Sequence, residues 1–194
     1  TMDMMVMHCA AVARGCDRTM VVADMPFGSF QYSIEETMRN AARFVTEAKV
    51  DGVKFEATPN HIEKTKAIVE MGIAVVGHVG LHPQAVGALG GLKVQGKDVD
   101  TARKVVREAL ALQEAGADVL LLECVPESLA QEITDSVEVP VIGIGASSRC
   151  DGQVLVLQDI LGITQGRIPR FARNFMQGND SIQAAISAYV QDVK

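Results

Sequence analysis

Short apolar runs that end in a charged or polar residue recur along the chain. In the clearest case, residues 119–122 (VLLL) lead directly into Glu123, and Pro126 follows shortly afterwards. A continuous apolar run of this length is typical of a strand buried on both faces, as in a parallel sheet. An ionised carboxylate is costly in apolar surroundings, yet the carboxyl end of a parallel strand is where α/β proteins keep their active sites. The run therefore predicts a buried strand with a functional acid at its end.

Similar runs predict further strands, and three of them also have polar ends: 20–24 with Asp24, 52–56 with Lys54 and Glu56, and 73–78 with His78. The segments 140–145 and 153–157 complete the predicted strands. Helical periodicity and end signals predict helices at 2–14, 33–48, 58–72, 100–115, 126–133 and 180–193. Ser33 and Glu36 predict a capping box at the start of one helix. We interpret the apolar, glycine-rich tract 86–96 as an ordered loop at a site or an interface.

This alternation of strands and helices predicts an α/β fold with a parallel sheet and right-handed crossovers. An open doubly wound sheet and a closed (β/α)₈ TIM barrel both fit the pattern. Acids at the ends of several strands favour the barrel, whose catalytic residues gather at one face. A barrel needs eight strands and about six are predicted. We therefore expect that the first one or two βα units are absent, and that residues 1–194 form a single, N-terminally incomplete barrel domain.

Composition narrows the class of protein without identifying a function. A chain of 194 residues suits one well-packed domain, and its net charge of -6 argues against nucleic acid or an anionic membrane surface as a partner. No apolar run approaches the roughly 18 residues of a membrane span. The four cysteines lack metal-binding spacing and are expected to be reduced. We expect a soluble, cytoplasmic protein.

The strand-end residues suggest a metal and substrate site. Asp24 and Glu56 are candidate ligands for Mg²⁺, which takes one or two carboxylates together with substrate and water. Either acid could instead cap a helix or pair with a lysine. Lys54 lies two residues before Glu56 and so points to the same side of its strand. It could hold a substrate carboxylate or form a structural ion pair with Glu56, and both readings stay open.

The histidines are less informative. His78 lies in a glycine-containing segment, which allows a ligand to approach the backbone closely, although a histidine of this kind is more often a hydrogen-bonded structural residue than a catalytic one. We expect His61 and His82 on the surface or in loops, and His8 in the first helix.

Several motifs together resemble the ketopantoate hydroxymethyltransferase family, over essentially the whole chain and in the family's order. They are VVADMPFGSF (21–30), VKFE (53–56), GHVGLHPQAV (77–86), GGLKVQG (90–96), LLECVPESLA (121–130) and PVIGIGASSRCDGQVLVLQDILG (140–162). The resemblance implies a (β/α)₈ barrel that assembles into a homo-oligomer, a decamer. It also implies Mg²⁺-dependent, aldol-type transfer of a hydroxymethyl group from 5,10-methylenetetrahydrofolate to 3-methyl-2-oxobutanoate, giving 2-dehydropantoate for pantothenate biosynthesis.

The resemblance also implies roles for five residues. Asp24 and Glu56 would bind the metal, Asp24, Lys54 and His78 would contact the oxo-acid, and Glu123 would be the catalytic base. The sequence departs from the family in two ways: it lacks the family's upstream Gly-Asp-Ser, and it has Ala57-Thr58 where the family has two glycines.

Two other functions stay open. One is another Mg²⁺-dependent barrel acting on 2-oxo acids, of the phosphoenolpyruvate mutase and isocitrate lyase kind, although the Lys-Lys-Cys-Gly-His loop of such enzymes is not found in the sequence. The other is a non-catalytic assembly subunit. The presence of all five candidate residues argues against the second.

Overall fold

A six-stranded parallel sheet organises the chain, and its strands follow one another in chain order. The computed structural model describes residues 1–194, except for the side chain of Leu89. The strands are β1 (Val22–Asp24), β2 (Gly52–Glu56), β3 (Ala74–Gly80), β4 (Val119–Glu123), β5 (Val141–Ile144) and β6 (Gly152–Gln153). In a doubly wound sheet the strand order reverses at a switch point, whereas in a barrel each strand pairs with the next. The observed order is therefore that of part of a barrel, and the doubly wound alternative is wrong.

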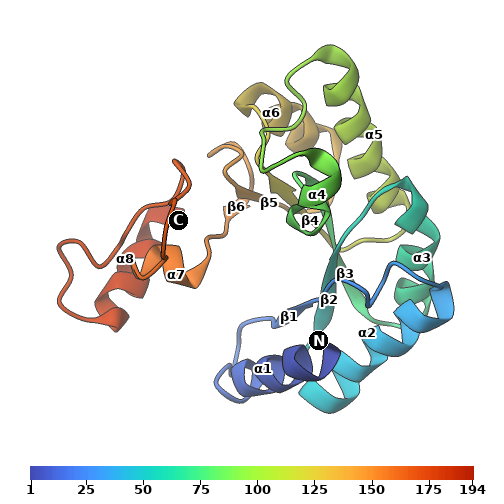
Figure 1. Cartoon of the computed structure of the whole chain (residues 1–194), viewed down its shortest axis with the longest axis horizontal. Helices are drawn as coiled ribbons and strands as arrows, with labels where there is room; N and C mark the ends of the chain where they lie inside the picture. Colours follow the sequence, from blue (N-terminus) through green and yellow to red (C-terminus); the bar gives the residue numbers. More distant parts are fainter.

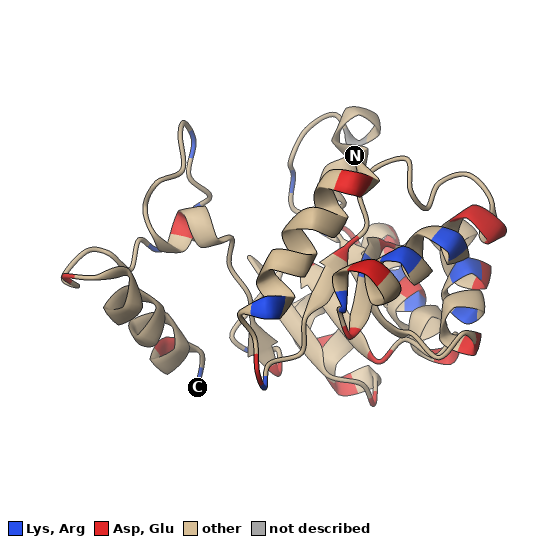
Figure 2. Ribbon diagram, turned by 90° about the horizontal axis from the view of Figure 1, so that it is seen from below, with Lys and Arg blue, Asp and Glu red and all other residues tan. Residues whose placement is uncertain are grey.

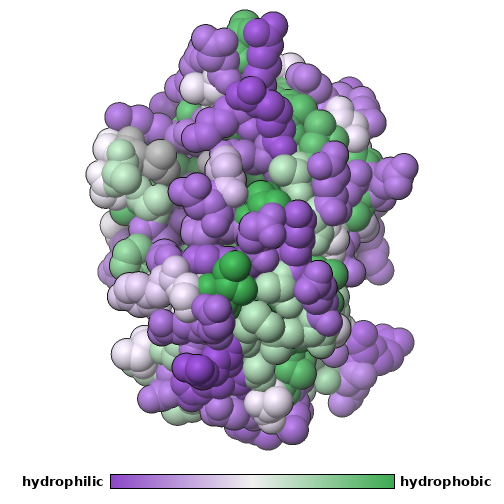
Figure 3. Space-filling model, turned by 90° about the vertical axis from the view of Figure 1, so that its right-hand side faces the viewer, coloured by the Kyte–Doolittle hydropathy of each residue, from purple (hydrophilic) through white to green (hydrophobic). Residues whose placement is uncertain are grey.

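Helices line one side of the sheet. The α-helices are α1 (Met2–Arg14), α2 (Ile34–Ala48), α3 (Ile62–Glu70), α4 (Val86–Leu89), α5 (Val99–Glu114), α6 (Glu127–Ser136), α7 (Leu157–Ile160) and α8 (Ile182–Val193). Two short 3₁₀ turns, η1 (Pro59–His61) and η2 (Pro83–Ala85), follow β2 and β3. In Figure 1, α2, α3, α5 and α6 form an arc around the outside of the strands, while α7 and α8 lie apart, beyond β6. The outer surface of the arc is largely hydrophilic (Figure 3).

Alternate strand residues form the core between the sheet and these helices. Val53, Phe55, Leu120 and Leu122 are completely buried. Gly77 has the same role on β3, because a Cβ there would lie 2.8 Å from a methyl group of Leu112 on α5. Since successive strand residues point to opposite faces, the residues between these core positions point away from the helices, into the concave side of the sheet. The predicted functional residues of β2 and β4 are among them.

Most predicted elements are confirmed, with shifted ends. The predicted capping box is only half formed, because Ser33 Oγ accepts from the Glu36 amide (3.1 Å) but no return bond from Glu36 occurs among the described hydrogen bonds. The helix predicted at 100–115 begins at Val99, because the carboxylate of Asp98 accepts from the Thr101 amide (2.9 Å) and caps it.

At the amino ends of the strands, aspartate carboxylates form hydrogen bonds to backbone amides of neighbouring strands. Three aspartates that precede a strand each accept the hydrogen bond of a free amide near the start of the preceding strand: Asp51 from Val21 (2.8 Å), Asp118 from Val75 (2.9 Å) and Asp151 from Val141 (2.8 Å). These acids satisfy backbone donors that would otherwise lack a partner in the sheet.

The C-terminal part of the chain leaves the sheet early. The strand predicted at 153–157 is reduced to Gly152–Gln153, and α7 begins four residues later. A second, small core then forms around Ile160, Phe175 and Ala185, and Leu155 packs against it. The hydroxyl of Tyr189 on α8 donates to the carbonyl of Gln153 (3.0 Å) and holds this unit to the end of the sheet.

Candidate functional site

Four polar side chains form a continuous row across the carboxyl ends of four neighbouring strands. Asp24 Oδ1 on β1 lies 2.9 Å from Lys54 Nζ on β2, and this nitrogen lies 3.4 Å from His78 Nδ1 on β3. His78 Nε2 lies 3.2 Å from Glu123 Oε2 on β4. Parallel pairing sets this arrangement, because it aligns Asp24 with Lys54 and Glu123 with Gly80, two residues beyond His78. We refer to these four residues as the polar row.

The polar row lines one cavity together with Glu56. This carboxyl-end cavity has a volume of about 380 Å³, and the rest of its lining is mainly apolar, including Leu121, Ile144 and Val154. All five residues predicted from the strand ends therefore meet in one place. A small, mostly apolar cavity with a few convergent polar groups is the usual form of a small-molecule site.

His78 is a neutral residue at the centre of the row. Its side chain is 2% exposed, and burial, followed by the nearby Lys54 ammonium, lowers its pKa to about 3. An ammonium can only donate, so Nδ1 facing Lys54 is the acceptor and Nε2 carries the proton. That proton faces Glu123, although Nε2 has no aligned hydrogen-bond partner among the described atoms. The ring thus offers a buried N–H to the cavity.

Glu123 has the electrostatics of a general base. Its side chain is 16% exposed, and burial raises its pKa to about 7 against the opposing effect of Lys54. A base with a pKa close to the working pH is both available and strong enough to accept a proton. The apolar run before Glu123 thus places its carboxylate where it accepts a proton readily.

Glu56 is held by a residue that the sequence pattern did not reveal. Its Oε1 accepts from the backbone amide of Gln84 (2.7 Å), and burial raises its pKa. The Gln84 side chain reaches across to the Met25 carbonyl (2.9 Å). Gln84, in the loop after β3, therefore joins the end of β2 to the loop after β1. The only sequence signal is Pro83, which starts a helical turn and so leaves the next amide free to bind an acid.

Lys54 was predicted either to hold a substrate carboxylate or to pair with Glu56, and the second of these predictions is wrong. Its carboxylate partner is Asp24 and not Glu56. The lysine side chain is 18% exposed and that of Asp24 is 49% exposed, so this is a pair at the rim of the cavity.

Two carboxylates of this cavity suit a hard cation. No group of three or more His, Cys, Asp or Glu side chains among the described residues is arranged to hold a metal. Mg²⁺, however, needs only one or two carboxylates when substrate and water complete its coordination. Asp24 and Glu56 supply oxygen donors from adjacent strands to one cavity, so the donor set fits Mg²⁺ bound jointly with a substrate.

His82 lies in a loop, which is one of the two expected positions, but it is not on the surface. His82 is buried, donates through Nε2 to the His78 carbonyl (3.0 Å) and packs edge-on against the His78 ring at 5.4 Å. Burial lowers its pKa to about 4. His61 is half-buried, with Nδ1 3.0 Å from the Glu56 carbonyl. The loop after β3 folds back over the site, which hydropathy along the chain does not reveal.

The Ala57-Thr58 departure is accommodated without loss of structure. Ala57 is buried and its amide donates to the His78 carbonyl (3.1 Å), while Thr58 precedes the η1 turn.

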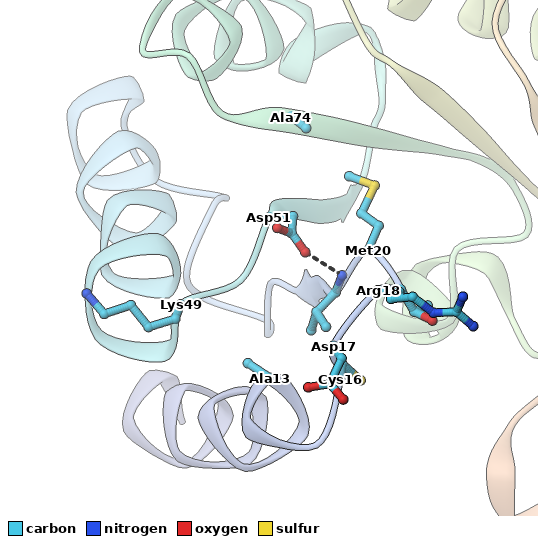
Figure 4. A pocket seen from close by; sticks show the side chains of 10 residues that line it. Ala13, Cys16, Asp17, Arg18, Met20, Lys49, Asp51 and Ala74 are labelled. Carbon is cyan, nitrogen blue, oxygen red and sulfur yellow. Dashed lines mark hydrogen bonds between the residues drawn. The ribbon is translucent and has the colours of Figure 1, made fainter.

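A larger cavity, of about 550 Å³, lies at the opposite end of the sheet. Figure 4 shows its lining, which includes Asp17, Arg18, Lys49 and Asp51. Asp51 is already used as the acceptor for the Val21 amide, the dashed line in the figure. The carboxyl-end cavity is smaller, but it contains the buried titratable groups, and we assign the chemistry to it.

Known proteins resemble the chain along its whole length. The family model described as ketopantoate hydroxymethyltransferase matches residues 1–194. The 3-methyl-2-oxobutanoate hydroxymethyltransferase of Heliobacterium modesticaldum is 47% identical over 193 residues, which are 100% of this chain and 70% of that protein. That of Carboxydothermus hydrogenoformans is 48% identical over 194 residues, again 100% of this chain and 70% of that protein.

Among solved structures, a phosphonomutase-like protein of Burkholderia cenocepacia J2315 is similar with a TM-score of 0.57 and 16% identity. The match covers 73% of this chain and 60% of that one. At this identity the likeness concerns the fold alone. No helix in the described part of the chain is long and apolar enough to span a membrane.

Proposed function

Because the chain belongs to the ketopantoate hydroxymethyltransferase family, we propose that it transfers a hydroxymethyl group from 5,10-methylenetetrahydrofolate to 3-methyl-2-oxobutanoate, giving 2-dehydropantoate for pantothenate biosynthesis. The observation that supports this reaction best is the pairing of Glu123, with its raised pKa, and the neutral His78 at a distance of 3.2 Å. Removal of the C3 proton of an oxo-acid needs a base of this kind.

The residues of the polar row divide the work on the oxo-acid. Lys54 supplies a cation for the carboxylate of the oxo-acid. Its ammonium group can exchange Asp24 for the substrate as partner, because the pair lies at the rim of the cavity, where water can solvate Asp24. The buried N–H of His78 donates to an oxygen of the same substrate. Glu123 accepts the proton from C3, which leaves an electron pair to attack the one-carbon unit.

Asp24 and Glu56 would hold Mg²⁺ beside the oxo-acid. When bound, the ion would polarise the keto and carboxylate oxygens and so acidify the C3–H bond. The repulsion between these two carboxylates, which contributes to the raised pKa of Glu56, would then be offset.

The transfer is balanced by one water molecule. The C3–H bond breaks and a bond forms between C3 and the methylene carbon of the donor. Water supplies the hydroxyl group of the product, and both carbon–nitrogen bonds of the methylene group are lost. The proton from C3 and the remaining proton of water end on the two nitrogens of tetrahydrofolate.

Proton exchange tests this function without the donor. The protein with Mg²⁺ and 3-methyl-2-oxobutanoate in deuterated water should replace the C3 proton by deuterium, measured by proton NMR. Glu123→Gln should slow this exchange by roughly 10²–10⁴-fold, the usual contribution of a general base. Glu127→Gln, at an exposed position on α6, is the matched control and should exchange at the parent rate.

Two outcomes would contradict the proposal. If the parent protein shows no exchange above the metal alone, the oxo-acid chemistry is wrong. If Glu123→Gln exchanges as fast as Glu127→Gln, the base is another residue.

We further propose that residues 1–194 are part of a single eight-stranded barrel domain, that the protein is cytoplasmic and that it forms a homo-oligomer. The chain order of the strands supports the barrel.

Exposed apolar side chains on α1 (Met4, Met7 and Val12) support self-association. Mixed charges along the outer helices (Figure 2) and the net charge of -6 favour neither nucleic acid nor an anionic membrane. Sedimentation velocity measures the state of assembly directly.

A further inference from the structure

A second, smaller pocket adjoins the carboxyl-end cavity. It has a volume of about 110 Å³ and shares Glu56 and Gln84 with the larger cavity. Its walls include Phe27 and Phe30 from the loop after β1, and His61 from the η1 turn. We refer to it as the aromatic pocket. Since the two cavities share two residues, they are immediate neighbours.

The lining of the aromatic pocket suits a flat, uncharged ring. The described residues that line it include no lysine or arginine, so it offers no cation to a carboxylate or a phosphate. Phe27 is 73% exposed, so its ring is open to a stacking partner. Phe30 and His61 pack edge-to-face at 5.4 Å and form a rigid inner wall.

Unused hydrogen-bonding groups lie at the same place. Gln84 Nε2 donates to the Met25 carbonyl (2.9 Å), which fixes the amide so that Oε1 is an acceptor, and this buried atom has no partner among the described residues. Gln31 Oε1 accepts from the amides of Gly28 (2.7 Å) and Phe30 (3.3 Å), which leaves its Nε2 as a donor toward a ligand. A ring that carries both donors and acceptors along one edge would satisfy both groups.

Hydrogen bonds from side chains on α2 and α3 hold the loop that carries Phe27 and Phe30. The buried Lys64 donates from Nζ to the carbonyls of Phe30 (2.6 Å) and Tyr32 (3.4 Å), and Asn40 donates to the carbonyl of Ser29 (2.8 Å). A pocket held in this way loses little conformational freedom when a ligand binds.

We propose that the aromatic pocket binds the fused pterin ring of the one-carbon donor, stacked on Phe27, while the oxo-acid occupies the carboxyl-end cavity. This inference rests on the proposed function, since it assigns the second substrate of the same reaction. The pocket is too small for the whole carrier, so the p-aminobenzoyl and glutamate parts extend outward from it. The methylene carbon, at the junction of ring and tail, then lies at the boundary between the two cavities.

Substitution of Phe27 tests the proposal. Phe27→Ala should raise the KM for 5,10-methylenetetrahydrofolate roughly tenfold, as loss of one stacking partner does elsewhere. Donor-independent deuterium exchange should stay at the parent rate, and Phe27→Tyr should restore the KM. Tyr32→Ala is the matched control, because Tyr32 is 71% exposed in the same loop but does not line the pocket.

Calorimetry gives a readout that does not depend on activity. Tetrahydrofolate should bind Phe27→Ala roughly tenfold more weakly than it binds Tyr32→Ala. A reduced methylpterin without a tail should compete with it, and p-aminobenzoylglutamate should not. Equal tetrahydrofolate affinity in the two variants, or competition by the tail alone, would overturn the assignment. Failure of exchange in the parent protein would instead overturn the proposed function, whatever the binding result.

Discussion

Lys54 lies between the carboxylate of Asp24 and the neutral imidazole of His78. The exposure of Asp24 determines how much stability is lost when Lys54 is replaced. Asp24 is half-exposed and can be solvated by water when the lysine is gone, so little stability should be lost. We expect Lys54→Met to keep the melting temperature within a few degrees of the parent. The same variant should raise the KM for 3-methyl-2-oxobutanoate by about tenfold or more, because a carboxylate loses its cation.

The two measurements on Lys54→Met separate a substrate-binding role from a structural one. Lys66→Met, an exposed lysine on α3 paired with Glu63, is the control for loss of one positive charge. A large loss of stability with an unchanged KM would make Lys54 a structural residue.

The raised pKa of Glu123 predicts the pH dependence of proton exchange. The base is active when it is deprotonated, so the exchange rate should rise with pH and level off above about 7. The Lys54 ammonium opposes the effect of burial on this pKa, so Lys54→Met should move the midpoint to higher pH. Exchange rates measured by NMR from about pH 5 to about pH 9 would give the midpoint for the parent protein and for Lys54→Met. A midpoint that does not move would show that the two groups do not interact.

The residues of the site differ in how far the sequence predicts them. Asp24, Lys54, Glu56, His78 and Glu123 were all predicted, because parallel strands bring their carboxyl ends to one edge. Gln84 and His82 were missed, because their positions depend on how the loop after β3 folds back over the strands. The partner of Lys54 was also not predictable, since sequence spacing gives the direction of a side chain but not the neighbour that it reaches.

At the level of the strands, acids at the amino ends have a structural role, whereas acids at the carboxyl ends line the cavity. Asp118 and Glu123 adjoin the same strand, and in the sequence each is a single acid beside an apolar run. They lie at opposite ends of the run, and their contacts differ accordingly: Asp118 accepts from the Val75 amide, whereas Glu123 faces the cavity. The sequence places an acid before or after its apolar run and so predicts the end of the strand at which it lies. The structure adds what each acid contacts there.

Asp118→Ala should therefore reduce stability and leave the chemistry unchanged. The loss of an acceptor for a backbone amide should cost about 1–2 kcal/mol of the free energy of unfolding. Asp118→Asn keeps an acceptor oxygen and should lose less, which makes it the matched variant. Urea unfolding of both variants, alongside their rates of deuterium exchange, tests this division. A fall in exchange rate at unchanged stability would show that the amino end takes part in the reaction.

The elements themselves were predictable where local signals and packing agree. The first helix and the second strand have the predicted bounds, Met2–Arg14 and Gly52–Glu56. The predicted strand at 153–157 fails because its apolar residues have another place to pack. Leu155 joins the separate core of the C-terminal unit, which forms from residues more distant in the sequence. Local periodicity does not distinguish between two such burial sites.

At the scale of the whole molecule, the carboxyl-end cavity places a functional acid where folding opposes its charge. Burial raises the pKa of Glu123 to about 7 from an ordinary value of 4.5. Below pH 4.5 the acid is protonated in both the folded and the unfolded states and has no effect on their balance. As the pH rises from 4.5 to about 7, the unfolded chain releases the proton while the folded protein retains it, so stability is lost.

Glu123→Gln should therefore stabilise the protein in a pH-dependent way. The variant removes the titration but keeps the shape, so its gain in melting temperature over the parent should be small near pH 4 and larger near pH 8, a span that brackets the pKa of about 7. The buried, neutral His78 and His82 act in the opposite direction, because the unfolded chain takes up their protons as the pH falls below 6.5. Both proteins contain these histidines, so the difference between the two melting curves retains only the effect of Glu123 on their pKa values, such as the rise that its charge causes in the pKa of His82. Glu127→Gln, at an exposed site, should give no such difference. A gain for Glu123→Gln that is equal at the two pH values would mean that the carboxylate is not opposed by its surroundings, and the argument for Glu123 as a base with a raised pKa would fail with it.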